Sequence, residues 1–213
     1  MKSFKLCLGA LAALLSVTAQ AAPIVDGLTE VRLDEPVALA VLDAGVTPSA
    51  TGTGTFDLNS LTFGFPITGG DLSEAVIPGS TIEHDGSGIL FTAGNISIEI
   101  GNFLINTTDL VISGFVRSIN PATGSALDLA GGVPLFDLST GSNVAGFPFI
   151  LSLTGTAAGA LNATFGTDLF SEGLRIGTAA TGPIVADVPA PESLGLLMLG
   201  AVALGLQRRR RLS

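Results

Sequence analysis

Tyrosine and tryptophan are absent from this sequence, and its single cysteine, Cys7, lies in an apolar N-terminal segment. Once that segment is removed, the chain has neither a disulfide nor a thiol nucleophile. The large side chains of the core must come from the 12 phenylalanines and from Leu, Ile and Val. Lectins and glycosidases usually hold sugar faces on Trp or Tyr, so the composition argues against a carbohydrate site.

Basic residues are also scarce. The stretch from Pro23 to Pro191 has 17 acidic residues, three arginines (Arg32, Arg117 and Arg175) and no lysine, a net charge of about −14. Such a surface repels a polyanionic backbone, which argues against a nucleic-acid partner. The same acidity keeps an exported protein soluble and lets divalent cations bridge it to anionic polymers such as extracellular polysaccharide.

The first 21 residues have the organisation of a secretory signal peptide. Lys2 and Lys5 precede an apolar run over 6–15, and small residues end at Ala19-Gln20-Ala21. This pattern predicts a signal helix over 1–21, removed by signal peptidase, so that the exported chain begins at Ala22.

The C-terminal residues form three consecutive elements: a proline-rich motif, an apolar run over 194–206, and an arginine cluster. An independent transmembrane helix needs about 20 apolar residues, so this run predicts a short helix that is held in the membrane transiently. The arginines stop translocation and stay on the cytoplasmic side. The motif is Val188, Pro189, Ala190, Pro191 and Glu192, and the stop-transfer cluster is Arg208, Arg209, Arg210 and Arg211.

These three elements over 188–213 resemble the PEP-CTERM sorting signal, a tail class also named after ice-binding proteins. The sequence departs from the family motif at Ala190, where Glu is frequent, and has Glu192 after the second proline. The resemblance implies processing by an exosortase, a membrane protease. It also implies transient passage through the inner membrane to the cell surface or extracellular matrix of a Gram-negative bacterium.

Between the two ends, short apolar segments alternate with Gly and Asp clusters. This pattern predicts a mainly β domain over 22–177, a β-sandwich or barrel-like fold with one or two short helices. We expect helices over 34–45, capped by Asp34, and over 157–165, capped by Thr156. The stretch 47–55 is predicted to be a loop and 178–187 a linker. The predicted strands span 53–57, 61–67, 81–84, 88–92, 96–105, 110–117, 133–138, 149–154 and 174–179.

Several short segments follow one another in a suggestive order. They are Phe65-Pro66-Ile67-Thr68-Gly69-Gly70, Glu83-His84-Asp85-Gly86, Ile96-Ser97-Ile98, Phe103-Leu104-Ile105, Leu135-Phe136-Asp137-Leu138 and Ala160-Leu161-Asn162-Ala163. Their order is similar to that in the HtaA-type domain of bacterial surface haemin-binding proteins. The resemblance implies a mainly β domain with short helices, and haem bound through a tyrosine with a histidine nearby. His84 lies in the matching segment, whereas the tyrosine has no counterpart.

Candidate chemistry is sparse. His84 is the only histidine and no G-x-S-x-G motif is present, so serine hydrolase chemistry is not expected. One imidazole without spaced His or Cys partners is weak support for a metal site, and we expect His84 in an exposed turn. The candidate calcium-binding residues are those of the turn 83–88 and the pair Asp34-Glu35. We therefore expect no catalytic residue, metal or cofactor, with haem and calcium as the alternatives.

The sequence favours a non-enzymatic surface or matrix protein with a structural, adhesive or biofilm role, whose partners are signal peptidase, an exosortase and extracellular polysaccharide. The alternative is a ligand-binding module related to the haemin-binding domains, in which His84 is the possible ligand residue.

Overall fold

The computed structural model describes residues 21–73, 78–121 and 124–186. The signal peptide predicted over 1–21, apart from Ala21, and the sorting signal predicted over 188–213 lie outside these ranges. Within the described ranges, no helix combines the length and the hydropathy needed to cross a bilayer.

The described chain is mainly β, as predicted, with one large antiparallel sheet and two short helices. Each strand predicted from the alternation overlaps an observed one. The strands are β1 (Ala22–Leu33), β2 (Thr47–Gly52), β3 (Thr55–Asp57), β4 (Thr62–Pro66), β5 (Gly69–Leu72), β6 (Thr81–Ala93), β7 (Ile96–Asn106), β8 (Val111–Asn120), β9 (Ser125–Val144), β10 (Phe147–Leu153) and β11 (Arg175–Val185).

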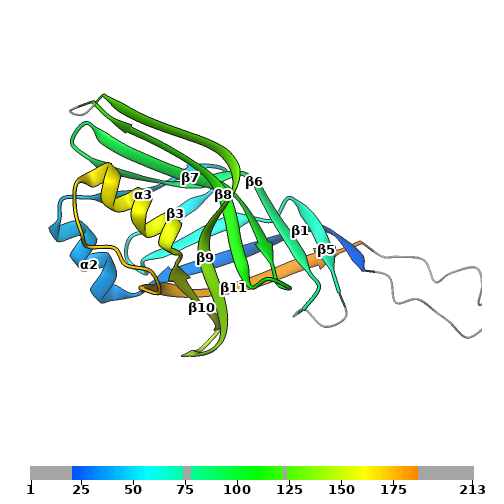
Figure 1. Cartoon of the computed structure of the whole chain (residues 1–213). Coiled ribbons are helices and arrows are strands. Elements are labelled where there is room, and N and C mark those ends of the chain that lie inside the picture. The colour runs from blue at the N-terminus through cyan, green and yellow to red at the C-terminus, as the bar shows by residue number, and fades with distance from the viewer. Residues whose placement is uncertain (1–20, 74–77, 122–123, 187–213) are drawn as a thin grey trace, which may run out of the picture.

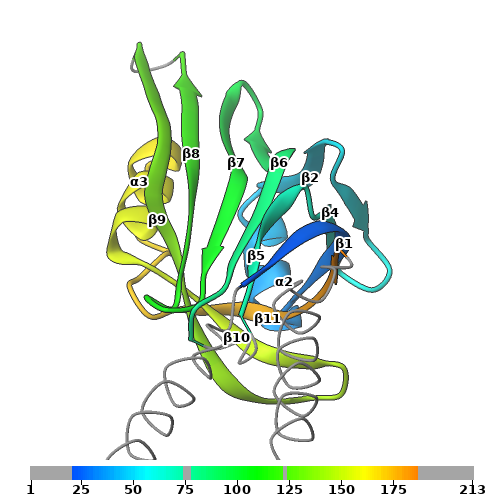
Figure 2. The same ribbon diagram turned by 90° about the vertical axis from the view of Figure 1, so that its right-hand side faces the viewer.

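The sheet closes on itself. Antiparallel pairing runs from β5 to β6, from β6 to β7, and so on to β11, and Figure 2 shows β6, β7, β8 and β9 side by side. The last strand, β11, pairs with β10 on one edge and with β1 on the other. The first residues of β1 pair in turn with β5, which completes the ring. One face of every strand in the ring therefore points into a shared interior.

Strand β11 corrects the predicted linker over 178–187. Its residues 178–185 are paired with β1, from Ile24↔Val185 to Arg32↔Thr178. The run of Ala, Gly and Thr looked like flexible chain, but small side chains also permit close packing. At Gly27 of β1, a Cβ atom would lie 2.4 Å from the backbone oxygen of Gly182. Closure of the sheet thus depends on residues that the sequence assigned to the linker.

Strand β2 corrects a second prediction, that of a threonine-rich loop over 47–55. Residues Thr47–Gly52 pair with β6 from Thr47↔Thr92 to Gly52↔Ser87. Val46 and Pro48 are buried and cover the interior, which gives this polar-looking strand an apolar side.

Glycines let the sheet bend sharply across β6 and β7. A Cβ at Gly88 would lie 2.4 Å from the Ile100 oxygen, and one at Gly101 would lie 2.7 Å from the Ser87 oxygen. The register shifts between His84 and Gly88 on β6 and between Gly101 and Leu104 on β7. Only residues without side chains allow strands to approach so closely at a bulge.

The two helices, α2 (Glu35–Asp43) and α3 (Gly155–Phe165), lie at the same end of the closed sheet, on the left of Figure 1. Thr154, not Thr156, caps α3: its hydroxyl accepts a hydrogen bond from the Ala157 N–H. Gly166 ends α3 in the left-handed conformation, as expected of a C-terminal glycine. Helix α2 follows β1 directly, and only Ala38 among its residues is buried.

We call the end of the sheet that α2 and α3 cover the helix end. At the opposite, terminal end, Ile24 pairs with Val185 and the Ala186 N–H donates to the Pro23 carbonyl, so the described chain begins and ends at one place (Figure 1). Any segment that precedes β1 or follows β11 therefore leaves the domain far from α2 and α3.

Candidate functional site: an apolar cavity at the helix end

The interior of the sheet contains a cavity of about 100 Å³. Side chains from both helices and from the surrounding strands line it, among them Val41 of α2, Leu161 of α3, and Phe103 of β7. Except for Thr29 and His84, every lining residue is apolar. The cavity arises because α2 and α3 cover the helix end of the ring without filling the space beneath them.

Several lining residues are partly exposed, and they lie in α2, in the β3–β4 turn and in the segment after α3. Leu58, in that turn, is 62% exposed and lines the cavity, while Phe56, Leu61 and Phe170 are half-buried. Phe170 is fixed by Asn162, whose Nδ2 donates to the Phe170 carbonyl at 2.7 Å and whose Oδ1 accepts from the Phe170 N–H at 3.1 Å. We call these partly exposed lining residues the mouth of the cavity.

Thr29 and His84 lie deep in the cavity, and the lining residues Ile105 and Ile112, next to Ile82 in the sheet, lie deeper still. Each is the lining residue of its strand that lies farthest from the helices, because Gly27 on β1 and Ile82 on β6 are not part of the lining. The His84 ring also contacts Phe65 edge-on, with 6.5 Å between the ring centroids. Phe65 in turn packs edge-on against Phe103 at 5.0 Å.

The His84 imidazole is held by hydrogen bonds at both nitrogens. Nδ1 lies 3.3 Å from the Phe103 carbonyl oxygen, and Nε2 lies 2.8 Å from Oγ1 of Thr29. A carbonyl only accepts, so Nδ1 carries the proton and Nε2 accepts from the Thr29 hydroxyl. The Thr29 oxygen can then accept from the hydroxyl of Thr181, 2.9 Å away. The hydroxyl of Thr29 and the imidazole of His84, the two polar groups in the cavity lining, are therefore both hydrogen-bonded within the protein.

Burial lowers the pKa of His84 from 6.5 to about 4, since desolvation disfavours the charged imidazolium. The Phe103 carbonyl and the charge of Asp85 raise the pKa, but by less than burial lowers it. At neutral pH the imidazole is therefore uncharged, in agreement with the tautomer that the hydrogen bonds define.

These observations correct the expectation that His84 lies in an exposed turn. Its side chain is 1% exposed, because β6 runs through the Asp-Gly cluster as a bulge and keeps Ile82 and His84 on the inner face. A neutral histidine is tolerated there because both ring nitrogens are hydrogen-bonded.

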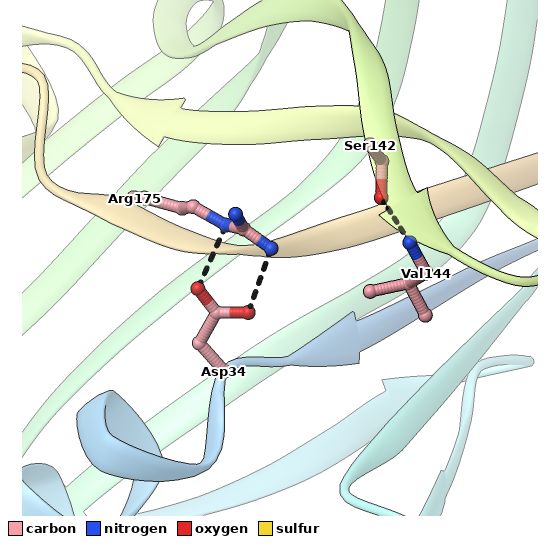
Figure 3. Close-up of polar contacts among 4 residues, drawn as sticks. All are labelled: Asp34, Ser142, Val144 and Arg175. Atoms are coloured by element: carbon pink, nitrogen blue, oxygen red, sulfur yellow. Dashed lines mark hydrogen bonds and ion pairs between the residues drawn. The ribbon is translucent and has the colours of Figure 1, made fainter.

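Asp34, a candidate calcium ligand, is engaged by an arginine. Its Oδ2 lies 2.8 Å from Nε of Arg175 and its Oδ1 accepts from Nη2 at 3.3 Å, as Figure 3 shows. Asp34 occupies the N-cap position of α2 as predicted, yet its carboxylate makes no capping hydrogen bond. The ion pair instead ties the start of α2 to β11. In the described part of the chain, no three His, Cys, Asp or Glu side chains lie close enough together to hold a metal ion.

The sequence singled out His84 but missed the residues that surround it. Thr29, its hydrogen-bond partner, lies 55 positions away on a strand that was not predicted. Val41 and Phe170 come from two other parts of the chain, and the sequence analysis assigned neither of them a role in a site. The sorting motif and the arginine cluster lie outside the described residues, so their assignment stays a prediction.

The fold and the cavity define a closed antiparallel β domain with a helix-covered apolar interior. No family model and no curated protein matches the chain. Solved structures do. The C-terminal domain of HtaA from Corynebacterium glutamicum aligns over 78% of this chain and 100% of that domain, with 16% identity and a TM-score of 0.58. The N-terminal domain of HtaA from the same organism aligns over 77% of this chain and 99% of that domain, with 10% identity and a TM-score of 0.51. The resemblance expected from the order of short segments is confirmed for the fold.

Proposed function

We propose that this protein is an exported, non-enzymatic binding module that takes an apolar ligand into the cavity between α2 and α3. The cavity itself is the observation that carries the proposal. Protein interiors are close-packed, and spaces larger than a water molecule are few. A space of about 100 Å³ with an almost wholly apolar lining is the form that small-molecule sites commonly take.

The arrangement of α2 supports the proposal. Only Ala38 of this helix is buried, whereas Val37, Val41 and Leu42 are half-buried and line the cavity. A helix that covers a space with partly exposed apolar side chains can separate from the sheet at low cost, since little buried area is lost. A ligand can therefore reach the interior without unfolding the sheet.

Absence of catalysis is part of the proposal. The hydroxyl and imidazole of Thr29 and His84 resemble a nucleophile and its base, but the partner of Nδ1 is a backbone carbonyl and not an orienting carboxylate. The two side chains are also buried beneath an apolar cavity, which gives water no polar path to them. The pair is better suited to holding two strands together than to turnover.

Haem, which the family resemblance implies, does not fit the residues of this cavity. The chain has no tyrosine, and its cysteine and both methionines, Met1 and Met198, lie outside the described residues. The remaining iron ligand would be His84, whose Nε2 lone pair is occupied by the Thr29 hydroxyl. No lysine or arginine lines the cavity to pair with the two propionates of haem.

Export and exosortase-dependent placement at the cell surface complete the proposal and rest on the two terminal signals in the sequence. The geometry agrees with that placement, because the terminal end of the domain is opposite the mouth. A tail that follows β11 would leave the mouth free. A structural or adhesive role remains the prediction made from the sequence.

The test is calorimetric titration of the protein purified from cells that export it, with 1-octanol as a small neutral probe. Ala160→Leu adds volume to a cavity-lining position on α3, and Ala163→Leu makes the same change at an exposed position of the same helix. We expect saturable binding to the wild type and to Ala163→Leu, and at least tenfold weaker binding to Ala160→Leu. Equal behaviour of the two variants would contradict a cavity site.

A further inference from the structure

The charge around the mouth restricts the ligand further. We propose, on the basis of the function proposed above, that the cavity selects neutral apolar ligands, such as an alkyl chain or ring with an uncharged polar end, and rejects carboxylates of the same size. The inference rests on three features: the paired inner wall, the acidic mouth and the size of the enclosed space.

The inner wall offers nothing to a charged group. The only polar lining residues, Thr29 and His84, are hydrogen-bonded to each other and to Thr181 and the Phe103 carbonyl. Burial of a carboxylate against this wall would forfeit its hydration without a compensating partner. The inner end of a ligand must therefore be hydrocarbon, and any polar group must remain at the mouth.

The mouth, however, carries negative charge. Asp43 follows the lining residue Leu42, Asp57 stands between Phe56 and Leu58, and Asp168 lies two positions before Phe170; all three aspartates are exposed. Hydrogen bonds from Ser60 and from the Asn59 N–H lower the pKa of Asp57, so its carboxylate stays ionised.

Two arginines flank lining residues, and the stretch from Pro23 to Pro191 contains no lysine. Arg175, next to Ile176, is paired with Asp34, whereas the exposed Arg32 lies on β1 between two lining residues. One exposed arginine against three exposed aspartates leaves a net negative charge at the mouth, so an anionic head group would meet repulsion, which weakens with salt.

The enclosed volume limits the part of the ligand that is buried. An engineered apolar cavity of about 150 Å³ binds benzene, and this cavity measures about 100 Å³. The closed space therefore accepts a short alkyl segment or a small ring, and a longer chain must extend past the exposed Leu58. This size and the acidic mouth disagree with haem, a broad macrocycle with two carboxylates.

The test compares 1-octanol with octanoate at pH 7.5 and low salt, by calorimetric titration of the exported protein. The two probes share a chain length and differ in charge. We expect octanol to bind at least tenfold more tightly than octanoate. The double variant Asp57→Asn/Asp168→Asn should narrow that ratio at least threefold by strengthening octanoate binding, whereas Asp71→Asn on β5, toward the terminal end, should leave it unchanged.

Three outcomes separate the selectivity from the site itself. If octanoate binds as tightly as octanol, and Ala160→Leu abolishes the binding of both, the proposed selectivity is wrong but the binding function stands. A saturable haemin Soret shift that His84→Ala abolishes would lead to the same conclusion and restore the haem interpretation. If Ala160→Leu and Ala163→Leu behave alike with both probes and with haemin, the binding function itself is wrong.

Discussion

The two ends of the closed sheet differ in how they are packed. Toward the terminal end, Ile82 is fully buried and Ala179 nearly so, around a space of only about 20 Å³, and β1 pairs with β11 along its length with one bulge. At the helix end, α2 and α3 cover a cavity whose lining includes half-buried side chains. The terminal end therefore contributes most to the stability of the fold, whereas the helix end retains space for a ligand. Substitutions at the terminal end should therefore lower stability without changing ligand affinity, whereas substitutions that fill the cavity should lower ligand affinity.

The largest effect is expected from where the chain is cut. A chain that ends at Gly177, the predicted domain boundary, lacks most of β11, so one edge of β1 and one edge of β10 lose their pairing and the ring stays open. We expect this chain to be unfolded, and a chain that ends at Ala186 to be folded. Far-UV circular dichroism with thermal melting distinguishes them. A cooperative transition in the shorter chain would show that closure is not needed for stability.

The next effect concerns the packed core. Ile82→Ala removes a fully buried side chain outside the cavity lining. We expect the free energy of unfolding to fall by about 3 kcal/mol, as for other large-to-small core changes, with no change in octanol affinity. Urea denaturation followed by circular dichroism measures it, since the chain has no Trp or Tyr fluorescence. A loss of affinity as large as the loss of stability would erase the distinction between the ends.

A smaller change in the free energy of unfolding is expected when the pH is lowered, because His84, which lies between the two ends, becomes protonated in the unfolded chain. The folded pKa of His84, about 4, lies below the ordinary value of 6.5, so the unfolded chain binds an extra proton between these values. Stability is thus greatest above pH 6.5 and falls as the pH decreases toward 4. Between pH 6.5 and 5 the loss should be about 2 kcal/mol.

The chain has one histidine, so the assignment of this slope is direct. Urea denaturation at pH 6.5 and pH 5 should give the slope in the wild type and not in His84→Gln, whatever the absolute stability of the variant. A slope that persists in His84→Gln would show that another group is responsible.

The smallest effect separates two ion pairs. Asp34 and Arg175 are 28% and 40% exposed and join α2 to β11, whereas Asp128 and Arg117 are 72% and 55% exposed on one surface hairpin. Asp34→Asn should cost up to about 1 kcal/mol, discounted for solvent screening, and Asp128→Asn close to nothing. Double-mutant cycles with Arg175→Gln and Arg117→Gln measure the two pair energies. Equal values would mean that the Asp34 pair does not help to fasten α2.

The sequence was most informative where alternation was regular. Strand β7, predicted over 96–105 and observed over Ile96–Asn106, has Ile98 and Ile100 on its inner face. Helix α3 was recognisable from Gly166 at its end, although its cap was placed two residues late. Such features depend on neighbouring residues alone, which a single sequence contains in full.

Closure and the cavity could not be predicted in the same way. Both β1 and β11 mix exposed apolar residues such as Val25 and Ile184 with Gly and Ala, so neither shows a clear period. The cavity depends on how far α2 and α3 stand from strands that are distant in sequence. The Ile82–His84 spacing was the one local signal that His84 faces inward.

The most direct measurement is a crystal structure of the protein with 8-bromo-1-octanol, whose bromine is located by its anomalous scattering. We expect the brominated end to lie deep in the cavity, against Phe103 and close to His84, with the hydroxyl at the mouth near Leu58. A bromine found only on the outer face of the sheet or at the terminal end, with no alcohol between α2 and α3, would contradict the account.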